Sequence, residues 1–356
     1  MIPEVYSVKN MPNMQRINEI GSEFWFDSEI KDIITESQET LVLSGRTAID
    51  VIIKDILKTR KIRNVYLPAY CCDSMIDPFI RNGIAVNLYD MYFDEKLQYL
   101  IDADLETDVF YVNNYFGYEN TISNKILEHF KNKGAVVIYD KTHSLFMTND
   151  ATDVYADYTF ASIRKWIGVV CGAIVYKKEG TFDLELKDYP YLQCKIDAMQ
   201  KKALFIKNGN GDKQLFLSKF GEFGHHLSEE YQGYKMDNLS VRIWQQYDKV
   251  AIRETRRKNA AVLHLDGKHH FIDKLSANCC PVFVPIFFES AEKRNAVRNS
   301  LIEEQIYCPI HWPKNKLVTP NMKVNNIFDT ELSLICDQRY TACDMERIIN
   351  VINKSL

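Results

Sequence analysis

Two side chains of opposite charge, Asp140 and Lys165, each follow an apolar run typical of a buried strand. Asp140 closes GAVVIYD (134–140), and Lys165 lies between YADYTFAS (155–162) and CGAIVYKK (171–178). A buried charge without a partner is costly, so Asp140 needs a bonding neighbour. A desolvated lysine has a lowered pKa, and its free amine can attack an aldehyde. The pair indicates covalent chemistry on a carbonyl, with helix capping by Asp140 and a solvated Lys165 as the plain alternatives.

Other polar and aromatic residues stand at the ends of the same expected strands, where ligands bind in open α/β sheets. SGRTAID (44–50) opens a helix whose free amides and positive dipole end suit a phosphate, although an ordinary N-cap explains it as simply. Tyr70 ends VYLPAY and either stacks on a flat ring or belongs to the core. Asn113, Asn114 and Tyr115 end a further strand, where hydrogen bonding within the strand end is an equal explanation.

The combination of these residues is more specific than any one of them. A helix start that binds phosphate, an aromatic side chain, an aspartate and a lysine follow one another at successive strand ends. Pyridoxal phosphate needs this set, because its phosphate takes amide donors, its ring takes a flat apolar face, its ring nitrogen takes a carboxylate and its aldehyde takes a lysine. The sequence therefore favours pyridoxal phosphate as the cofactor.

The elements that must position these residues alternate between strand and helix from about residue 41 to 178. This pattern predicts an α/β domain with a mostly parallel sheet flanked by helices. The expected helices are 46–57, 74–83 and 124–134, and the expected strands are 65–70, 84–90, 108–117, 134–140, 155–162 and 171–178. The chain is then polar and helical to about residue 260. A small α+β domain follows, with PVFVPIFFES (281–290), IYCPIHWP (306–313) and helices near 291–304 and 343–355.

We expect the large domain to span residues 1–225 and the small C-terminal domain residues 226–356, with the N-terminal segment a candidate to pack on the small domain. The chain has 356 residues, of which 26% are charged and 46% hydrophobic, as in ordinary globular proteins. A net charge of −4 gives no electrostatic footprint for nucleic-acid binding.

Membrane insertion and metal chemistry are not expected either. No apolar run reaches the roughly 18 residues that span a bilayer. The N-terminus, MIPEVYSVKNMPNMQ, is not a secretory signal. Nine scattered Cys without metal-ligand spacing indicate a reduced, cytoplasmic interior and argue against a metal hydrolase.

On these motifs the chain resembles the DegT/DnrJ/StrS family of sugar aminotransferases, which are fold-type I pyridoxal-phosphate enzymes. SGRTAID is similar to the family's phosphate loop, LPAYCCDSM to the segment with the stacking aromatic, VVIYDKTHSLF to the Asp-x-x-His strand end, and ASIRKWIGVVCGAIV to the lysine segment. The resemblance implies that Lys165 binds the aldehyde, that Asp140 keeps the ring nitrogen protonated and that His143 supports catalysis. It also implies cofactor contacts from Gly45, Arg46, Thr47, Tyr70 and Ser162.

The chain departs from the family pattern in three places. Phe160 stands where the family has a serine five positions before the lysine, and the glycine-rich stretch after the lysine is reduced to Gly168 and Gly172. GYKMDNLSVR (233–242) has no clear counterpart of the asparagine that reaches a phosphate across the dimer. Lys235 and Asn238 are the candidates to replace it.

The resemblance implies an aminotransferase that moves an amino group from an amino-acid donor, glutamate in the family, to a keto sugar. The acceptor would be nucleotide-linked, in surface polysaccharide or related biosynthesis. Lys165 would carry the proton between donor and cofactor. Asn114, Tyr115 and His311 are the candidate substrate contacts. Family members are homodimers with shared active sites, and the segment 225–242 is expected to reach the neighbour.

Two other functions remain as alternatives. One is a different pyridoxal-phosphate reaction on a sugar, such as dehydration or a lyase reaction. Dehydrating family members often replace the lysine with histidine, so Lys165 favours transamination. The other is a non-catalytic regulatory protein on the same fold, although a scaffold has no need to keep both Asp140 and Lys165.

Overall fold

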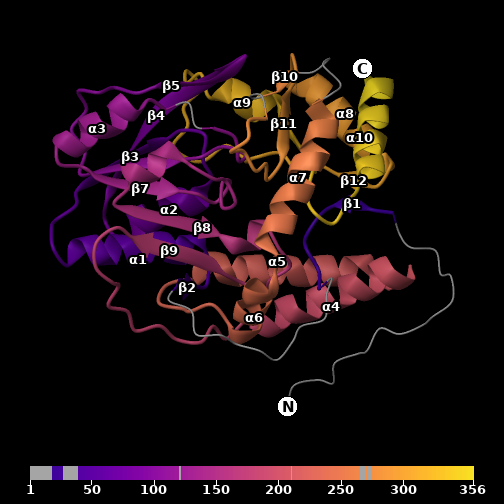
Figure 1. The fold of residues 1–356 in the computed structure, drawn as a ribbon, viewed down its shortest axis with the longest axis horizontal. Helices are drawn as coiled ribbons and strands as arrows, with labels where there is room; N and C mark the ends of the chain where they lie inside the picture. Colours follow the sequence, from indigo (N-terminus) through magenta and orange to yellow (C-terminus); the bar gives the residue numbers. More distant parts are fainter. Residues whose placement is uncertain (1–17, 27–38, 120–121, 210, 265–269, 272–274) are drawn as a thin grey trace.

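The largest element is an eight-stranded sheet built from residues 40–177, on the left of Figure 1. The computed structural model describes residues 18–26, 39–119, 122–209, 211–264, 270–271 and 275–356. The strand order is β2-β9-β8-β7-β6-β3-β4-β5. The strands are β2 (Thr40–Val42), β3 (Asn64–Pro68), β4 (Ala85–Asp94), β5 (Lys96–Leu100), β6 (Val109–Asn113), β7 (Val136–Asp140), β8 (Tyr158–Ser162) and β9 (Ala173–Lys177).

The central strands β8, β7, β6, β3 and β4 all run parallel to their neighbours in this row, whereas β9 and β5 are antiparallel to theirs. Helices α1 (Gly45–Leu57), α2 (Asp73–Arg81) and α3 (Asn124–Asn132) flank the sheet. The predicted α/β class, with a mostly parallel sheet between helices, is confirmed.

Alternation along the strands explains how both faces of the sheet are covered. Residues 65, 67, 109, 111, 136 and 138 belong to one buried cluster with α1 and α2. The alternate residues of the same strands, 66, 110, 112, 137 and 139, belong to a second cluster with α3. Because successive side chains of a strand point to opposite faces, both faces must be apolar, and the strands read as continuous apolar runs.

A second core lies in the C-terminal unit, at the upper right of Figure 1. It contains the antiparallel strands β10 (His270–Phe271), β11 (Val284–Phe287) and β13 (Glu331–Leu334), with helices α8 (Ala291–Glu303), α9 (Asn325–Thr330) and α10 (Ala342–Ser355) beside them. Ile20 of β1 (Ile20–Gly21) belongs to this core, and β1 pairs in parallel with β12 (Ile306–Tyr307).

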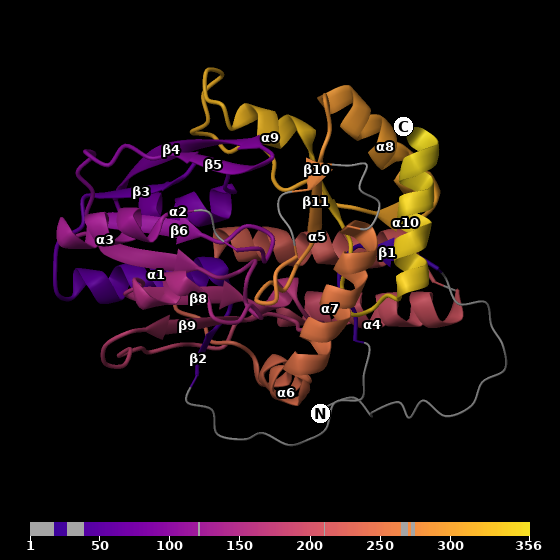
Figure 2. The same cartoon turned by 45° about the horizontal axis from the view of Figure 1, so that its top comes forward.

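Four helices connect the two cores: α4 (Leu192–Asn208), α5 (Lys213–Glu229), α6 (Asn238–Gln246) and α7 (Lys249–His264). Helices α4 and α5 lie side by side, and α7 rises from α6 toward the C-terminal unit (Figure 2). Ile252 of α7 packs with the residues around the lysine segment, whereas Ala260 and Leu263 pack in the second core. The expected domain boundary, between residues 225 and 226, lies inside α5.

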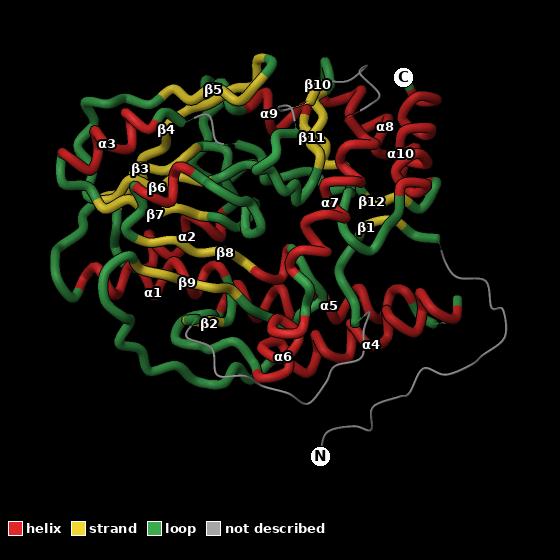
Figure 3. Tube along the Cα trace, viewed as in Figure 1, coloured by secondary structure: helices red, strands yellow, loops and turns green. Residues whose placement is uncertain are grey.

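Figure 3 separates the strand-rich large sheet from the mainly helical remainder of the chain. Two 3-10 turns, η1 (Ala151–Val154) and η2 (Ile163–Lys165), flank β8. Turn η2 starts directly where β8 ends, and it carries the lysine of the expected site.

Candidate active site

The carboxyl ends of β6, β7 and β8 bring the expected polar residues to one edge of the sheet. These strands are adjacent and parallel, with Asn113 opposite Asp140 and Asp140 opposite Phe160. Ser162 is the last residue of β8, and Lys165 closes η2 immediately after it. The structure thus places Asp140, Ser162 and Lys165 at the same edge, as parallel strands with a common direction require.

Asp140 is a buried carboxylate with two hydrogen-bond donors. Its Oδ1 accepts from the backbone N–H of Thr142 at 2.8 Å, and its Oδ2 accepts from the hydroxyl of Tyr111 at 2.7 Å. Burial raises the pKa of Asp140, while the bonds from Thr142 and Tyr111 and the charge of Lys165 oppose this rise. A carboxylate fixed in this way can pair with a cationic nitrogen without reorienting.

Lys165 directs its amine at His143, with 3.2 Å between Nζ and Nε2. Burial lowers the pKa of Lys165, and the nearby charge of Arg164 acts in the same direction, whereas Cys72 and Asp140 oppose it. A lysine with a lowered pKa spends more of its time as the uncharged amine, which is the nucleophilic form.

The hydrogen bonds of His143 define its tautomer. The backbone N–H of Phe116 can only donate, and it faces Nδ1 at 3.3 Å. Burial lowers the pKa of His143 well below its ordinary value, so the ring is neutral. A neutral ring that accepts at Nδ1 carries its proton on Nε2 and donates it to Lys165. The geometry therefore fits Lys165 as the free amine.

A tight turn after β6 presents the N–H of Phe116 to His143. Phe116 and Gly117 have φ of 62° and 84°, in the left-handed region. Asn114 closes this turn, because its Oδ1 accepts from the N–H of Gly117 at 3.2 Å and its Nδ2 donates to the carbonyl of Tyr118 at 2.7 Å. A strained turn beside a reactive group is typical of functional sites, where the surrounding structure fixes the conformation.

Two aromatic residues of the C-terminal unit cover the histidine and the lysine. The Trp312 ring stacks on His143, with centroids 5.3 Å apart and planes at 21°, and it lies 5.3 Å from Nζ of Lys165. The His311 ring meets His143 edge-on at 5.4 Å. His311, an expected substrate contact, thus lies beside His143, and its Nδ1 bonds to the hydroxyl of Ser333 at 2.9 Å.

Tyr70 and Tyr115 lie together in an aromatic cluster. Their rings stack at 5.5 Å, and the Tyr115 hydroxyl donates to the backbone carbonyl of Tyr70 at 2.6 Å. The Tyr70 ring also meets Trp312 and Phe328, each at 5.0 Å. Two residues after Tyr70, the thiol of Cys72 lies close enough to Lys165 to influence its pKa. In this conformation the ring that lies over the amine of Lys165 is that of Trp312.

The start of α1 lies against the end of β8. Ser44 caps the helix by accepting from the N–H of Thr47 at 3.3 Å, and the Thr47 hydroxyl donates to the carbonyl of Tyr231 at 2.8 Å. A Cβ on Gly45 would meet Cβ of Ser162 at 3.8 Å. Among the described residues the N–H groups of Gly45 and Arg46 have no hydrogen-bond acceptor. Free amides at a helix start, beside a serine, form a site suited to a phosphate.

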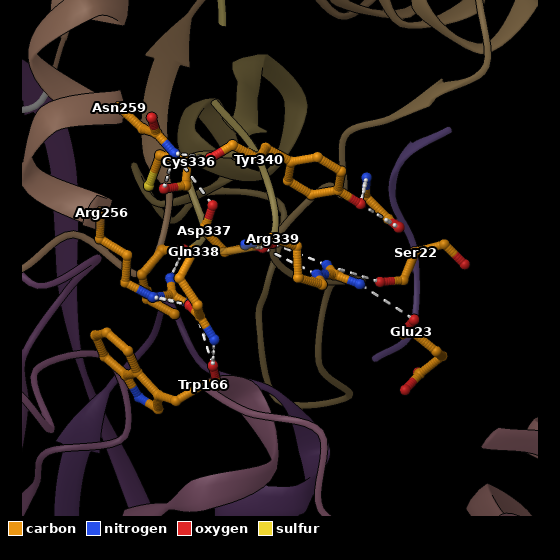
Figure 4. A network of polar contacts seen from close by, with 12 residues as sticks. Ser22, Glu23, Trp166, Arg256, Asn259, Cys336, Asp337, Gln338, Arg339 and Tyr340 are labelled. Carbon is orange, nitrogen blue, oxygen red and sulfur yellow. Dashed lines mark hydrogen bonds and ion pairs between the residues drawn. The ribbon is translucent and has the colours of Figure 1, made fainter. Parts of the chain in front are cut away.

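The residue after the lysine ties the site to the C-terminal unit. The carbonyl of Trp166 accepts from Nη2 of Arg256 at 3.2 Å and from Nε2 of Gln338 at 2.7 Å (Figure 4). The Trp166 indole donates to the carbonyl of Thr142 at 2.7 Å. The lysine segment is thus fixed both to the Asp140 segment and to α7, which preorganises the site.

Sequence reasoning missed Tyr111 and Arg164 as members of the site. Tyr111 has a signal in retrospect, because a tyrosine inside a strand buried on both faces must direct its hydroxyl to a polar partner. Arg164 follows a buried residue and precedes the lysine, so a second charge at a strand end was visible. The sequence alone does not show which residues the side chains of Tyr111 and Arg164 contact.

Beneath His311, the carboxyl group of Glu331 is fully buried and should make stability depend on pH. It accepts from the hydroxyl of Ser333 at 2.5 Å and from the N–H of His311 at 2.9 Å, and burial raises its pKa to about 8. Between about pH 4.5 and pH 8 the folded state holds a proton that the unfolded state has released. Stability therefore falls as the pH rises through this window and is constant above it.

Replacing Glu331 by Gln removes the ionisable group. Between pH 5 and pH 8 the free energy of unfolding of the variant should therefore rise, relative to that of the wild type, by on the order of 3 kcal/mol. Urea unfolding at pH 5, 6.5 and 8 measures this gain. Glu303→Gln, at an exposed position at the end of α8, is the control and should run parallel to the wild type. If the free energy of unfolding of Glu331→Gln has the same pH dependence as that of the wild type, this carboxyl group does not hold the proton.

Comparison with known proteins supports the architecture. No family model matches the chain, and no curated protein matches it in sequence. Solved structures do match it. PseC from Helicobacter pylori, an aminotransferase involved in the biosynthesis of pseudoaminic acid, is 13% identical, with a TM-score of 0.65 over 95% of this chain and 99% of that one.

Two further solved structures agree with this fold. A DegT/DnrJ/EryC1/StrS aminotransferase from Brucella abortus is 15% identical, with a TM-score of 0.60 over 89% of this chain and 86% of that one. NtdA from Bacillus subtilis, solved with bound cofactor PMP, is 16% identical, with a TM-score of 0.58 over 89% of this chain and 74% of that one. The chain therefore has the fold of these aminotransferases, and the resemblance seen in the motifs is confirmed at the level of the fold.

Two other classes of site do not occur in the described residues. Within them, no helix is long and apolar enough to cross a membrane. The same part of the chain holds no group of three or more His, Cys, Asp or Glu side chains that could bind a metal ion.

Proposed function

We propose that this chain is a pyridoxal-phosphate-dependent aminotransferase that acts on a sugar. The observation that carries the proposal is the desolvated amine of Lys165, which has a lowered pKa, lies 3.2 Å from Nε2 of His143 and is beside the buried carboxylate of Asp140. The solved structures of the same fold are aminotransferases, and one of them contains PMP.

The residues at the site fit this cofactor in three respects. Asp140 offers a carboxylate that is already oriented by Thr142 and Tyr111. Lys165 is a desolvated amine within the same site. The start of α1 offers free amides beside Ser162, where Gly45, Arg46 and Thr47 would hold the phosphate group.

When bound, pyridoxal phosphate supplies an aldehyde that takes the amino group and a ring that accepts the electrons released from carbon. Lys165 would bind the aldehyde and, once released, would carry a proton at Nζ as base and then acid. Asp140 would hold the ring nitrogen in its protonated form. His143 holds the Lys165 amine in place through Nε2, and Trp312 and His311 exclude water from the lysine.

The donor and acceptor belong to the proposal as well. We infer glutamate as the amino donor and a nucleotide-linked keto sugar as the acceptor, in surface polysaccharide or related biosynthesis in the cytoplasm. The involvement of PseC in the biosynthesis of pseudoaminic acid supports a sugar acceptor. Asn114, Tyr115 and His311 stay candidates for substrate contact, although the side chains of Asn114 and Tyr115 already bond within their own turn and cluster.

We further propose a homodimer with shared active sites. Tyr231, Lys235 and Met236 in the segment 225–242 lie near the start of α1 of their own chain: the carbonyl of Tyr231 accepts from Thr47, and Lys235 bridges to Val42. The segment is therefore close to the proposed phosphate site, from which Lys235 or Asn238 would extend to the neighbouring subunit. Sedimentation velocity at micromolar concentration tests this, and a monomer would contradict it.

The test of the function starts from the wild-type protein and pyridoxal phosphate. We expect a visible absorbance band that borohydride abolishes by reducing the bond between cofactor and lysine, and mass spectrometry should locate the stable adduct on Lys165. In a separate sample without borohydride, glutamate should convert the spectrum to that of the amino form without any sugar present, because the two half-reactions are separate. A panel of other amino acids is the control for donor choice.

A requirement for both substrates before any spectral change would contradict transamination. A sugar product formed without any donor would indicate a dehydration or lyase reaction instead. No band at all would favour the regulatory protein.

A further inference from the structure

Two arginines lie on the backbone segments that flank the proposed phosphate site. Arg46 is the second residue of α1, and Arg164 is the residue before Lys165 in η2. A Cβ on Gly45 would lie 3.8 Å from Cβ of Ser162, so the two backbone segments that carry the arginines are neighbours. Arg46, Arg164 and Lys165 thus start from neighbouring backbone segments.

The guanidinium groups of Arg46 and Arg164 lie close enough to affect each other. Burial lowers the pKa of Arg164, and the charge of Arg46 lowers it further, whereas Glu23 and Cys171 oppose the shift. Like charges at short range in a poorly solvated place repel each other, and a structure keeps such a pair only where an anion compensates them.

Among the described residues, no carboxylate forms an ion pair with Arg46 or Arg164, although the charge of Glu23 acts on Arg164. In the described part of the chain, Arg164 makes no hydrogen bond or ion pair, and the Nε atoms of both arginines are buried without a partner. The guanidinium of Arg46 makes one long bond, 3.4 Å from Nη1 to the carbonyl of Leu227. Glu23 is the nearby carboxylate, and it is already bonded to Lys195 at 3.1 Å.

Arg256 and Arg339 find acceptors among the described residues. Arg253 has a buried Nε without a partner, as Arg46 and Arg164 do, but its Nη2 donates to the carbonyl of Ala277. Arg256 bonds to Gln338 and to the carbonyl of Trp166 (Figure 4). It also donates to the carbonyl of Val282. Arg339 pairs with Asp337 at 2.8 Å (Figure 4). Buried arginine donors normally find acceptors within the protein, and a buried donor without one needs an explanation, which a bound anion can provide.

We propose that Arg46 and Arg164 form a two-arginine clamp for the phosphate group of the bound cofactor, together with the free amides of α1 and Ser162. The clamp rests on the proposed function in one respect only: that the bound phosphate group belongs to pyridoxal phosphate. A phosphate dianion matches two guanidinium groups in charge, and its oxygens accept their paired donors. Arg164 then fixes the phosphate from the residue next to the lysine that binds the aldehyde.

The experiment compares pyridoxal phosphate with pyridoxal, which lacks the phosphate, by absorbance titration of the cofactor-free protein. Arg164→Gln and Arg46→Gln should each weaken binding of pyridoxal phosphate roughly 10- to 100-fold, the effect of losing a charged hydrogen-bond partner. Binding of pyridoxal should change less than about 3-fold. Arg60→Gln is the matched control, since Arg60 is exposed beyond the other end of α1 and donates only to the carbonyl of Gly134.

Inorganic phosphate alone gives a readout that does not depend on the aldehyde chemistry. Phosphate should raise the melting temperature of the wild type and of Arg60→Gln, but not of Arg164→Gln. If the wild type shows no band with pyridoxal phosphate while this phosphate effect holds, the proposed function fails and the anion clamp stands. Equal losses for pyridoxal and pyridoxal phosphate, or unchanged phosphate binding in both arginine variants, would overturn the clamp.

Discussion

A Lys165→Ala variant is expected to lose at least about 10⁴-fold in transamination rate, the largest effect of any single change in this chain. Lys165 is proposed both to bind the aldehyde and to carry the proton, and general acid–base catalysis alone contributes up to about 10⁴-fold. The methyl group of alanine can do neither. The variant should still bind pyridoxal phosphate, because the phosphate site and Asp140 are intact. Stopped-flow absorbance with excess glutamate measures the half-reaction directly.

Two comparisons make the Lys165→Ala result interpretable. Lys178→Ala removes an exposed lysine just after β9, whose amine donates to the carbonyl of Val154 at 2.9 Å, and should leave the rate unchanged. Added methylamine should restore part of the activity of Lys165→Ala by supplying the missing base. A residual rate within about tenfold of the wild type would show that another group carries the proton.

Gly117→Ala is expected to destabilise the folded protein by about 4 kcal/mol or more, the largest effect on stability. A Cβ at this position would lie 2.0 Å from the carbonyl oxygen of Cys280 and 2.7 Å from that of His143, and φ is +84°. The Cys280 carbonyl cannot withdraw easily, because the carbonyls of Gly117 and Phe116 accept from the N–H groups of Cys280 and Val282. Overlap of this size with backbone atoms belongs to the severe class of substitutions.

The chain offers a matched control for Gly117→Ala. Gly83 also has a positive φ, +73°, but a Cβ there would have no atom within 4 Å. Gly83→Ala should therefore cost only the left-handed conformation, about 1 kcal/mol. Urea unfolding of both variants separates the backbone strain from the overlap. Similar losses for the two would mean that the turn at Gly117 can relax, and that its close contact with Cys280 is not rigid.

The positions of Asp140 and Lys165 could be predicted because they depend only on where parallel strands end. Strand ends follow from apolar runs, and a shared direction places those ends on one edge. The strand expected over 108–117 is shorter than predicted, since β6 stops at Asn113. The residues after it form the turn with positive φ at Phe116 and Gly117, which an apolar pattern cannot show.

Side-chain partners and the middle of the chain were harder to predict. Tyr70 meets Trp312 and Phe328 from segments more than 200 residues away, and no local pattern encodes such contacts. In α5 the buried residues Phe216, Phe220, Phe223 and Leu227 have helical spacing, but Gly221 and Gly224 weaken that signal. Arg46 and Arg164 each stand out in the sequence, but their closeness depends on α1 lying against β8.

The double acceptor role of the Trp166 carbonyl has a consequence for how the molecule unfolds. Arg256 of α7 and Gln338 of the C-terminal unit both donate to this one atom, next to Lys165 (Figure 4). Separating the two cores would break these bonds and leave buried donors unsatisfied, at a cost comparable to a local unfolding step. A ligand that tightens the lysine segment therefore stabilises the distant helix pair α8 and α10 as well, and heating should melt both cores in one calorimetric transition.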